Sequence, residues 1–354
     1  MKRAFKGLLA FGLAAICGSA QVARAEMRMQ GAGSTFVAPL MQRWTTEYQN
    51  AHPDVKIDYQ SIGSGGGIKG ITEKTLEFGA TDAPMSKKEI AKAGGGVVNI
   101  PVIAGAIVPA YNLPGVSATL KLDGPTLTDI FQGKIARWND PKIAATNPGV
   151  KLPDLAITPV HRTDGSGTTY IFTNYLSTQS EDFKEKIGTA KQVEWPGGQG
   201  GKGNDGVTQV VQGTPGAIGY VELAYARQNK LAFADMKNKD GNFVTATPDA
   251  TSKAGDAAAA EMKESLVVPL WNQAGKDVYP ICGLVYVVVY EDMAYVKTEA
   301  KAKALVDFLS WATHDGQKMA GELDYAPLNA AIQKKVSAQL GALTWGGKPV
   351  VAVK

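Results

Sequence analysis

The segment Arg162-Thr163-Asp164-Gly165-Ser166-Gly167-Thr168-Thr169, residues 162–169, joins a strand to an apolar helix and is the most informative stretch of this chain. Apolar residues recur at helical spacing from Ile171 to Leu176, so a helix is predicted to begin near Thr168. The first N–H groups of a helix have no partner within it and carry partial positive charge. The segment therefore predicts a helix start that faces a small anion.

Hydroxyl groups and bare backbone make the same segment rich in hydrogen-bond donors. Gly165 and Gly167 let the main chain approach a ligand because they carry no Cβ. The hydroxyls of Ser166 and Thr168 add side-chain donors. Together these groups are suited to binding a small oxyanion.

Arg162 and Asp164 add a charged pair to these donors. The guanidinium of Arg162 is a planar fork that stays charged, and Asp164, two residues on, can hold it in place. An ordinary helix capped by Asp or Ser, with Arg162 on the surface, is the alternative interpretation. The segment taken alone does not decide between the two.

Two further glycine-rich segments precede helical patterns. The first, Gly31–Phe36 (GAGSTF), places Thr35 and Phe36 at the first turn of a predicted helix. The second, Ser61–Gly67 (SIGSGGG), follows a strand-like run and carries Ser64 in its turn. Glycine with Ser or Thr is common at helix starts for capping alone. Three such starts in one chain favour an anion site more than any one of them does.

Asp82 stands in the sequence FGATDAP, residues 78–84, after a short strand-like run and before a proline. Its side chain is therefore predicted at the carboxyl end of a strand, where the ligand crevices of α/β proteins lie. The alternative is an aspartate that caps the next turn. A carboxylate in an anion site would accept a hydrogen bond from an anion that keeps a proton at neutral pH and would repel an anion that keeps none.

Residues 1–25 have the pattern of a cleaved secretory signal peptide. Basic residues precede an apolar run from Gly7 to Ile16, and Ala23-Arg24-Ala25 is a small-x-small cleavage site. The mature chain would then begin near Glu26. A lipoprotein anchored at Cys17 is a weaker alternative, because Ile16 stands where a small residue is expected.

The charge balance argues against nucleic-acid binding. Loss of residues 1–25 removes four of the 37 basic residues and no acidic residue, which leaves 33 of each sign. A nucleic-acid-binding protein usually carries a basic surplus or stripe. The same cleavage leaves Cys282 as the sole cysteine, in an apolar run, and a buried inert thiol is predicted there.

Strand-like and helical runs alternate through the chain and predict an α/β fold. Residues 55–59 alternate with period two, while residues 102–111 and 280–290 are continuous apolar runs typical of buried strands. The run at 197–206 is too rich in glycine to be regular and is predicted to be a loop. The roughly 330 residues after the signal suggest two domains, and no second apolar run reaches membrane-spanning length.

Six motifs of the chain, in this order, resemble those of the periplasmic phosphate-binding proteins of bacterial ABC uptake systems. The resemblance covers the chain from Gly31 to about Tyr325. The motifs are Gly31–Phe36 (GAGSTF), Gly63–Gly67 (GSGGG), Phe78–Pro84 (FGATDAP), Arg162–Thr168 (RTDGSGT), Gly200–Gly206 (GGKGNDG) and Gly216–Glu222 (GAIGYVE). Ser34, where the family often has Ala, and Gly65, where a second Ser is frequent, are mild departures from the pattern.

The resemblance implies phosphate-contacting positions in four of the motifs. These positions are Thr35, Phe36, Ser64, Asp82, Arg162, Ser166, Gly167 and Thr168, with Asp164 supporting Arg162. Asp82 would be the discriminator against sulfate, and Arg162 would offset the charge of the anion. No cofactor and no metal are implied.

The resemblance also implies a type II periplasmic-binding-protein fold, with the ligand in a cleft between two α/β lobes. Lobe I would comprise residues 26–107 and 280–354, and lobe II residues 108–279. The lobes would close over phosphate by a hinge, and the protein, a periplasmic monomer, would deliver the anion to the permease subunits of a membrane ABC transporter.

The residues give weaker support to an enzymatic function. Ser166 lies between glycines, but its surroundings are not the G-x-S-x-G elbow, and His52, His161 and His314 form neither a triad nor a metal cluster in the sequence. The glycine-rich run 197–206 lacks a Walker pattern, and Gly65-x-Gly67-x-x-Gly70 is only a weak dinucleotide fingerprint. A phosphate-ester hydrolase thus remains the less favoured alternative, and a binding protein for sulfate or molybdate the nearer one.

Overall fold

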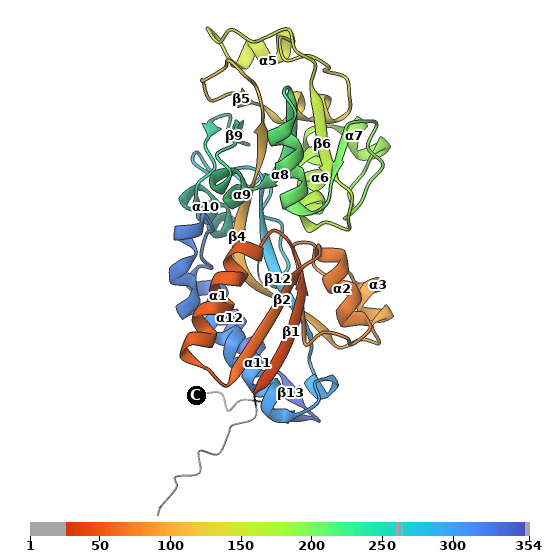
Figure 1. Cartoon of the computed structure of the whole chain (residues 1–354), viewed down its shortest axis with the longest axis vertical. Coiled ribbons are helices and arrows are strands. Elements are labelled where there is room, and N and C mark those ends of the chain that lie inside the picture. The colour runs from red at the N-terminus through yellow and green to blue at the C-terminus, as the bar shows by residue number, and fades with distance from the viewer. Residues whose placement is uncertain (1–25, 260–261, 263–264, 351–354) are drawn as a thin grey trace, which may run out of the picture.

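Two lobes share one curved β-sheet (Figure 1). The computed structural model describes residues 26–259, 262 and 265–350. The predicted signal peptide, residues 1–25 with Cys17, lies outside the described residues. Strands of the large sheet, from one edge to the other, are β2 (Val55–Ser61), β1 (Met27–Gly33), β3 (Phe78–Thr81), β12 (Cys282–Tyr290), β4 (Val97–Tyr111), β8 (Ala217–Glu222), β6 (Thr158–Arg162) and β7 (Gln199–Gly201), and β9 (Ala232–Phe233) pairs with β4.

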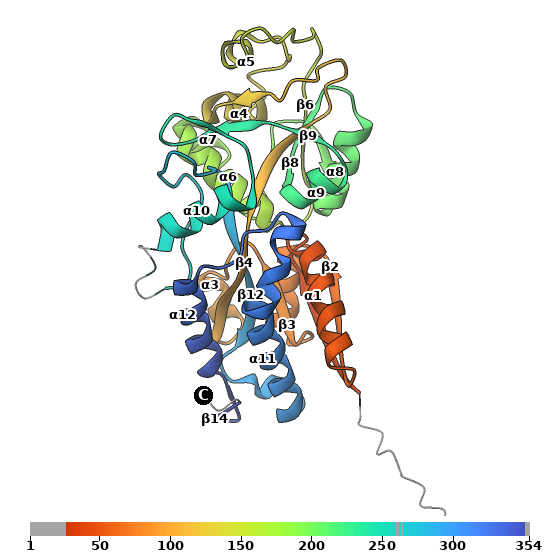
Figure 2. The same cartoon turned by 90° about the vertical axis from the view of Figure 1, so that its left-hand side faces the viewer.

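Helices flank this sheet, and two small sheets lie apart from it (Figures 1 and 2). The helices are α1 (Ala38–Ala51), α2 (Ser64–Thr72), α3 (Lys87–Lys92), α4 (Gly124–Phe131), α5 (Pro141–Thr146), α6 (Gly167–Gln179), α7 (Glu181–Lys186), α8 (Gly203–Gly213), α9 (Leu223–Gln228), α10 (Pro248–Ala259), α11 (Glu299–Thr313) and α12 (Ala330–Gly341). The small sheets are β11 (Phe243–Val244), β10 (Asp235–Lys237) and β5 (Lys121–Leu122), and β13 (Thr344–Trp345) with β14 (Lys348–Pro349). None of these helices is both long and apolar enough to cross a lipid bilayer.

Strand β4 belongs to both lobes. Its first part, to Ala106, pairs antiparallel with β12, and its last part, from Ile107, pairs antiparallel with β8. Both β4 and β12 are almost wholly buried, as the continuous apolar runs predicted. The two lobes are therefore joined by long strands rather than by a flexible linker. The expected lobe boundaries at residues 107/108 and 279/280 stay a prediction.

Alternate residues of β12 serve the two faces of the sheet in lobe I. Val287 and Val289 join the main core with α1 and α11, while Val288 and Tyr290 join a smaller core with α2. Side chains of a strand point alternately to its two faces, so this sheet has a helix layer on each side (Figure 2). Burial on both faces explains why the sequence of β12 is continuously apolar.

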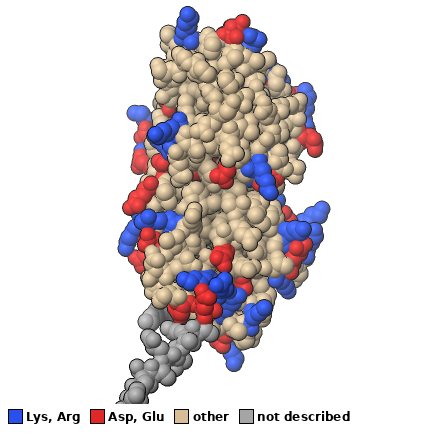
Figure 3. Space-filling model, viewed as in Figure 1, with Lys and Arg blue, Asp and Glu red and all other residues tan. Residues whose placement is uncertain are grey.

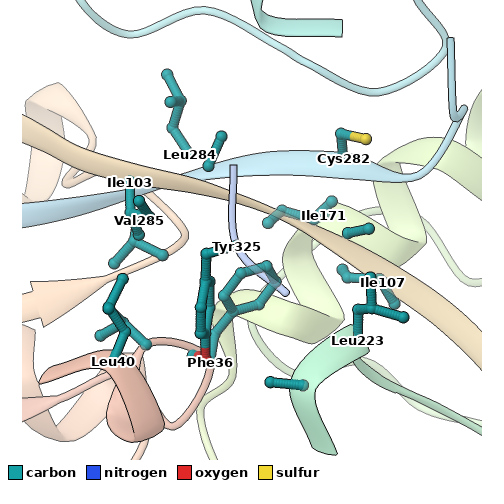
Figure 4. Close-up of a cluster of buried hydrophobic side chains, with 14 of the residues drawn as sticks. Phe36, Leu40, Ile103, Ile107, Ile171, Leu223, Cys282, Leu284, Val285 and Tyr325 are labelled. Atoms are coloured by element: carbon teal, nitrogen blue, oxygen red, sulfur yellow. The ribbon is translucent and has the colours of Figure 1, made fainter. Parts of the chain in front are cut away.

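The main core continues without a break from lobe I to lobe II, as the buried side chains of Figure 4 illustrate. Phe36 and Tyr325 lie side by side in it, with ring centroids 6.5 Å apart. Cys282 is wholly buried, as predicted, and burial raises the pKa of its thiol to about 12. The thiol is therefore protonated at physiological pH and poorly reactive.

The glycine-rich run 197–206 is not the irregular loop that its composition predicted. It contains strand β7 and the start of helix α8. A Cβ on Gly201 would lie 2.4 Å from the backbone nitrogen of Val207, so the strand and the helix approach more closely than a side chain permits. Glycine here serves close packing within regular structure.

Candidate functional site

Parallel strands bring the predicted site loops to the border between the lobes. In lobe I, β1 runs parallel to β2 and β3, and in lobe II, β6 runs parallel to β7 and β8. The carboxyl ends of parallel strands share one edge of a sheet, which is where α/β proteins bind ligands. All four predicted site segments follow the carboxyl end of a strand.

The two lobes touch through backbone at this border. The amide of Gly65 in lobe I donates to the carbonyl oxygen of Gly165 in lobe II over 2.8 Å. A Cβ on Gly65 would lie 3.2 Å from the Cα of Gly165, so the pair of glycines permits this close approach. At the rim, Lys191 of lobe II and Glu89 of lobe I form an ion pair of 2.6 Å.

Asp82 is buried at the end of β3, with 3% of its surface exposed. Its Oδ1 accepts a short hydrogen bond from the hydroxyl of Ser34, and its backbone amide donates to Ser64 Oγ over 3.2 Å. Burial raises the pKa of Asp82 to about 7, against the opposing effects of the Ser34 hydrogen bond and the charge of Arg162. The site thus holds a carboxyl group that titrates near neutral pH.

Asp164 accepts two hydrogen bonds from the guanidinium of Arg162. The Nε and Nη2 atoms of Arg162 donate to the two carboxylate oxygens of Asp164 over 2.8 and 2.6 Å. Burial alone would raise the pKa of Asp164, but the hydrogen bonds and charge of Arg162 outweigh it and hold this pKa below its usual value. The remaining Nη1 donates to Thr168 Oγ1 over 3.2 Å. A buried, oriented cation therefore stands at the start of α6.

Ser166 caps helix α6. Its Oγ accepts from the amide of Thr169 over 3.0 Å, which leaves the hydroxyl proton for another acceptor. Gly167 follows it and lies against lobe I: a Cβ there would be 2.5 Å from Asp82 Oδ2 and 2.6 Å from Ser64 Oγ. The helix begins at Gly167, one residue before the predicted start.

Three consecutive carbonyl oxygens before α1 are each held by a tyrosine hydroxyl. Tyr59 donates to Ser34 O over 2.7 Å, and Tyr225 and Tyr325 donate to the carbonyl oxygens of Thr35 and Phe36 over 2.6 Å each. With these oxygens fixed, the turn keeps one orientation. The amide of Phe36 then points back toward Ser34 Oγ, at 3.1 Å. Thr35 and Phe36 lie in the turn before α1, which begins at Ala38, and not within its first turn as predicted.

The structure brings all the predicted site residues together at the border between the lobes. Each of the eight expected phosphate-contacting residues is buried, and hydrogen bonds or close contacts link them across it. Their binding roles stay a prediction. Within the described ranges, no group of three His, Cys, Asp or Glu side chains is arranged to hold a metal ion.

Sequence reasoning missed two buried polar residues of the site. Ser34, noted only as a departure from the family pattern, donates to Asp82. Asn204, in a motif to which no role was given, contacts hydroxyls of both lobes. The GGKGNDG motif was a signal for the second, but nothing in the sequence shows what its asparagine touches.

Comparison with known proteins gives one consistent family. Residues 18–315 match the PBP superfamily domain. The chain is 42% identical over 313 residues to a phosphate-binding protein PstS of Xylella fastidiosa, covering 88% of this chain and 84% of that one. It is 44% identical over 310 residues to PstS of Pasteurella multocida, with coverages of 87% and 88%.

Solved structures show the same fold at lower identity. A high-affinity periplasmic phosphate-binding protein, PfluDING, solved with bound phosphate, superposes with a TM-score of 0.70 at 18% identity, covering 88% of this chain and 93% of that one. An ABC-type phosphate transport receptor from Vibrio cholerae gives a TM-score of 0.53 at 18% identity, with coverages of 84% and 99%. These likenesses establish the type II periplasmic-binding-protein architecture. Together with the close sequence relatives, they show that the chain belongs to the PBP superfamily and, within it, to the family of PstS phosphate-binding proteins.

Proposed function

We propose that this protein binds inorganic phosphate between its two lobes in the periplasm and delivers it to a membrane ABC transporter. Family membership makes the chain a solute-binding protein rather than an enzyme. The observation that carries the choice of ligand is Asp82, a buried carboxyl that accepts from the Ser34 hydroxyl and lies against the first residue of α6. We expect a monomer, and permease subunits as its membrane partners.

The donors of the site suit an anion with several oxygens. Arg162 supplies buried positive charge that Asp164 offsets in part and orients. The start of α6 offers the backbone N–H groups of Gly167 and Thr168 from lobe II. At the start of α2 the N–H groups of residues 65–67 are already hydrogen-bonded, so lobe I offers the N–H of Ser64. An anion between these groups would be held from both sides, and enclosure would strengthen each hydrogen bond.

Asp82 supports phosphate over a fully deprotonated anion. As a carboxylate it can only accept, so it pairs with the proton that phosphate retains and repels sulfate. The second candidate, a sulfate or molybdate binder, gains from the raised pKa of Asp82, about 7, because a protonated carboxyl can donate to such an anion. The two candidates therefore differ most clearly above pH 7.

Titration calorimetry of ligand-stripped protein at pH 8.5, first with phosphate and then with sulfate, tests the proposal. We expect tight phosphate binding and no displacement by sulfate, whereas the Asp82→Asn variant should bind sulfate measurably. Equal affinity of the parent protein for both anions would overturn the choice of phosphate. Unchanged sulfate exclusion in the variant would remove Asp82 from the discriminating role.

Closure of the lobes would accompany binding, with β4 and β12 as the connection that bends. Hinge closure around a ligand is the motion for which periplasmic binding proteins are a standard example. A closed form would present the transporter with a surface that the empty form lacks. Solution scattering should show a smaller radius of gyration with phosphate than without it, and an identical radius in both states would contradict the hinge.

A further inference from the structure

Asn204 connects the two lobes through a single side chain. It is wholly buried at the start of α8 in lobe II. Its Nδ2 donates to Thr35 Oγ1 of lobe I over 2.8 Å and to Thr168 Oγ1 of lobe II over 3.2 Å. Its backbone amide also donates to Thr35 Oγ1, over 3.2 Å. Both threonines are among the expected phosphate contacts.

The hydrogen bond that the side-chain oxygen of Asn204 accepts fixes the orientation of its amide group. Its Oδ1 accepts from the backbone N–H of Glu222 over 2.9 Å. A backbone N–H can only donate, so the oxygen of the amide must face it. The NH₂ group is thereby directed at the two threonine hydroxyls, which meet a donor on that side.

Each hydroxyl is left with one possible use of its proton. A hydroxyl has two lone pairs and one proton. Thr35 Oγ1 accepts twice from Asn204, and Thr168 Oγ1 accepts from Asn204 and from Arg162 Nη1. With both lone pairs engaged, each oxygen can only donate further. Among the described residues, none accepts a hydrogen bond from either hydroxyl.

We propose that Asn204 is a positioning residue that makes the hydroxyls of Thr35 and Thr168 obligate donors to the bound anion. Because Thr35 belongs to lobe I and Asn204 to lobe II, the hydroxyl of Thr35 is oriented in this way only when the lobes are in contact. The inference rests on the proposed phosphate site. Hydroxyls that can only donate serve the unprotonated oxygens of the ligand. Asp82 is then the acceptor for its proton, so donor and acceptor positions in the pocket are assigned before the ligand arrives.

A double-mutant cycle separates this role from a merely structural one. We expect Asn204→Ala to weaken phosphate binding about tenfold or more in calorimetry at pH 8.5. In a background that carries Thr35→Val and Thr168→Val, the same substitution should change the Kd less than twofold, because no hydroxyl remains to be oriented. The control is Asn112→Ala, which removes an amide that donates to a backbone carbonyl at the opposite end of α8 from Asn204, Gln212 O at 2.9 Å.

The outcomes distinguish this inference from the proposed function. Absence of phosphate binding by the parent protein would overturn the function itself. If the parent protein binds phosphate, either of two results would overturn only the positioning role. One is a Kd of Asn204→Ala within twofold of the parent Kd, and the other is an equal loss of affinity from Asn204→Ala in both backgrounds. Thermal melting of each ligand-free variant reports folding, and Asn204→Ser completes the same cycle if the alanine variant does not fold.

Discussion

Gly167 of lobe II lies directly against the carboxylate of Asp82 of lobe I, and this contact leaves no room for a side chain. A Cβ on Gly167 would stand 2.5 Å from Asp82 Oδ2. The first backbone N–H of α6 and the acidic group expected to read the proton of the ligand therefore share one small space. Glycine is required here by the approach of the lobes, since its backbone conformation is an ordinary helical one.

Substitution of Gly167 tests how closely the lobes must approach. Gly167→Ala would force the lobes apart or displace Asp82, at a cost of about 1–3 kcal/mol in binding, roughly 5- to 150-fold in Kd. Phosphate titration with scattering of the liganded form measures both effects. Gly213→Ala, at the end of α8 with open space around its Cβ, is the matched control and should leave binding unchanged. Wild-type affinity in Gly167→Ala would show that the site does not need this contact.

Removal of the buried cation should weaken binding strongly. Arg162→Ala deletes the charge proposed to face the anion and leaves the partly buried carboxylate of Asp164 without its cation. We expect a loss of about 2 kcal/mol or more, roughly 30-fold in Kd. Arg137, which pairs with Asp154 at the surface, is the control, and Arg137→Ala should change affinity little. Similar losses from both variants would point to general charge rather than to the site.

The raised pKa of Asp82 predicts how the ligand-free protein responds to pH. Because its pKa is about 7 in the folded chain and 3.8 in the reference state, this group contributes stability that is fully present below pH 3.8 and is lost progressively as the pH rises from 3.8 to about 7. The loss should approach about 1.4 kcal/mol per pH unit. The side chain of Asp82→Asn cannot titrate. The free energy of unfolding of this variant relative to the parent protein, measured by chemical unfolding, should therefore be higher at pH 8 than at pH 5. A constant difference between the two proteins would contradict the shifted pKa.

The rim ion pair between Lys191 and Glu89 should stabilise the closed form modestly. Both side chains are about one-quarter exposed, at 25% and 27%, so solvent screens their attraction. Glu89→Gln should therefore cost about 0.2–1 kcal/mol of phosphate affinity, and less at high salt. Titrations at two ionic strengths measure it, with Asp307→Asn, which breaks the exposed pair of Lys303 within α11, as control. A salt-independent loss would mean that Glu89 acts through its cap of α3 instead.

Local motifs made much of the site predictable. Arg162 to Thr168 lie within one short segment, so the sequence alone could show donors, cation and helix start together. The strands β4 and β12 were visible because burial on both faces demands continuous apolar runs.

Long-range partners escaped the same reasoning. Asn204 meets Thr35 across 169 positions, and Tyr325 meets Phe36 across 289. Such contacts are set by how β4, β8 and β12 assemble, which no local pattern encodes. The prediction for residues 197–206 was wrong for a related reason. Gly201 permits close packing against helix α8, whereas composition alone suggests an irregular loop.

The order of strands in the shared sheet also decides when the chain can finish folding. β12, which ends at residue 290, lies between β3 and β4 in the sheet, although both of these strands come much earlier in the sequence. During synthesis at 5–20 residues per second, the edges of β3 and β4 would stay unpaired for roughly 10 to 35 s after β4 is complete. Lobe I is thus kept unfinished until nearly the whole chain exists, and open strand edges invite misassociation in that interval. The signal peptide expected at residues 1–25 would direct such an unfinished chain to export, and its sheet would then be completed on the far side of the membrane.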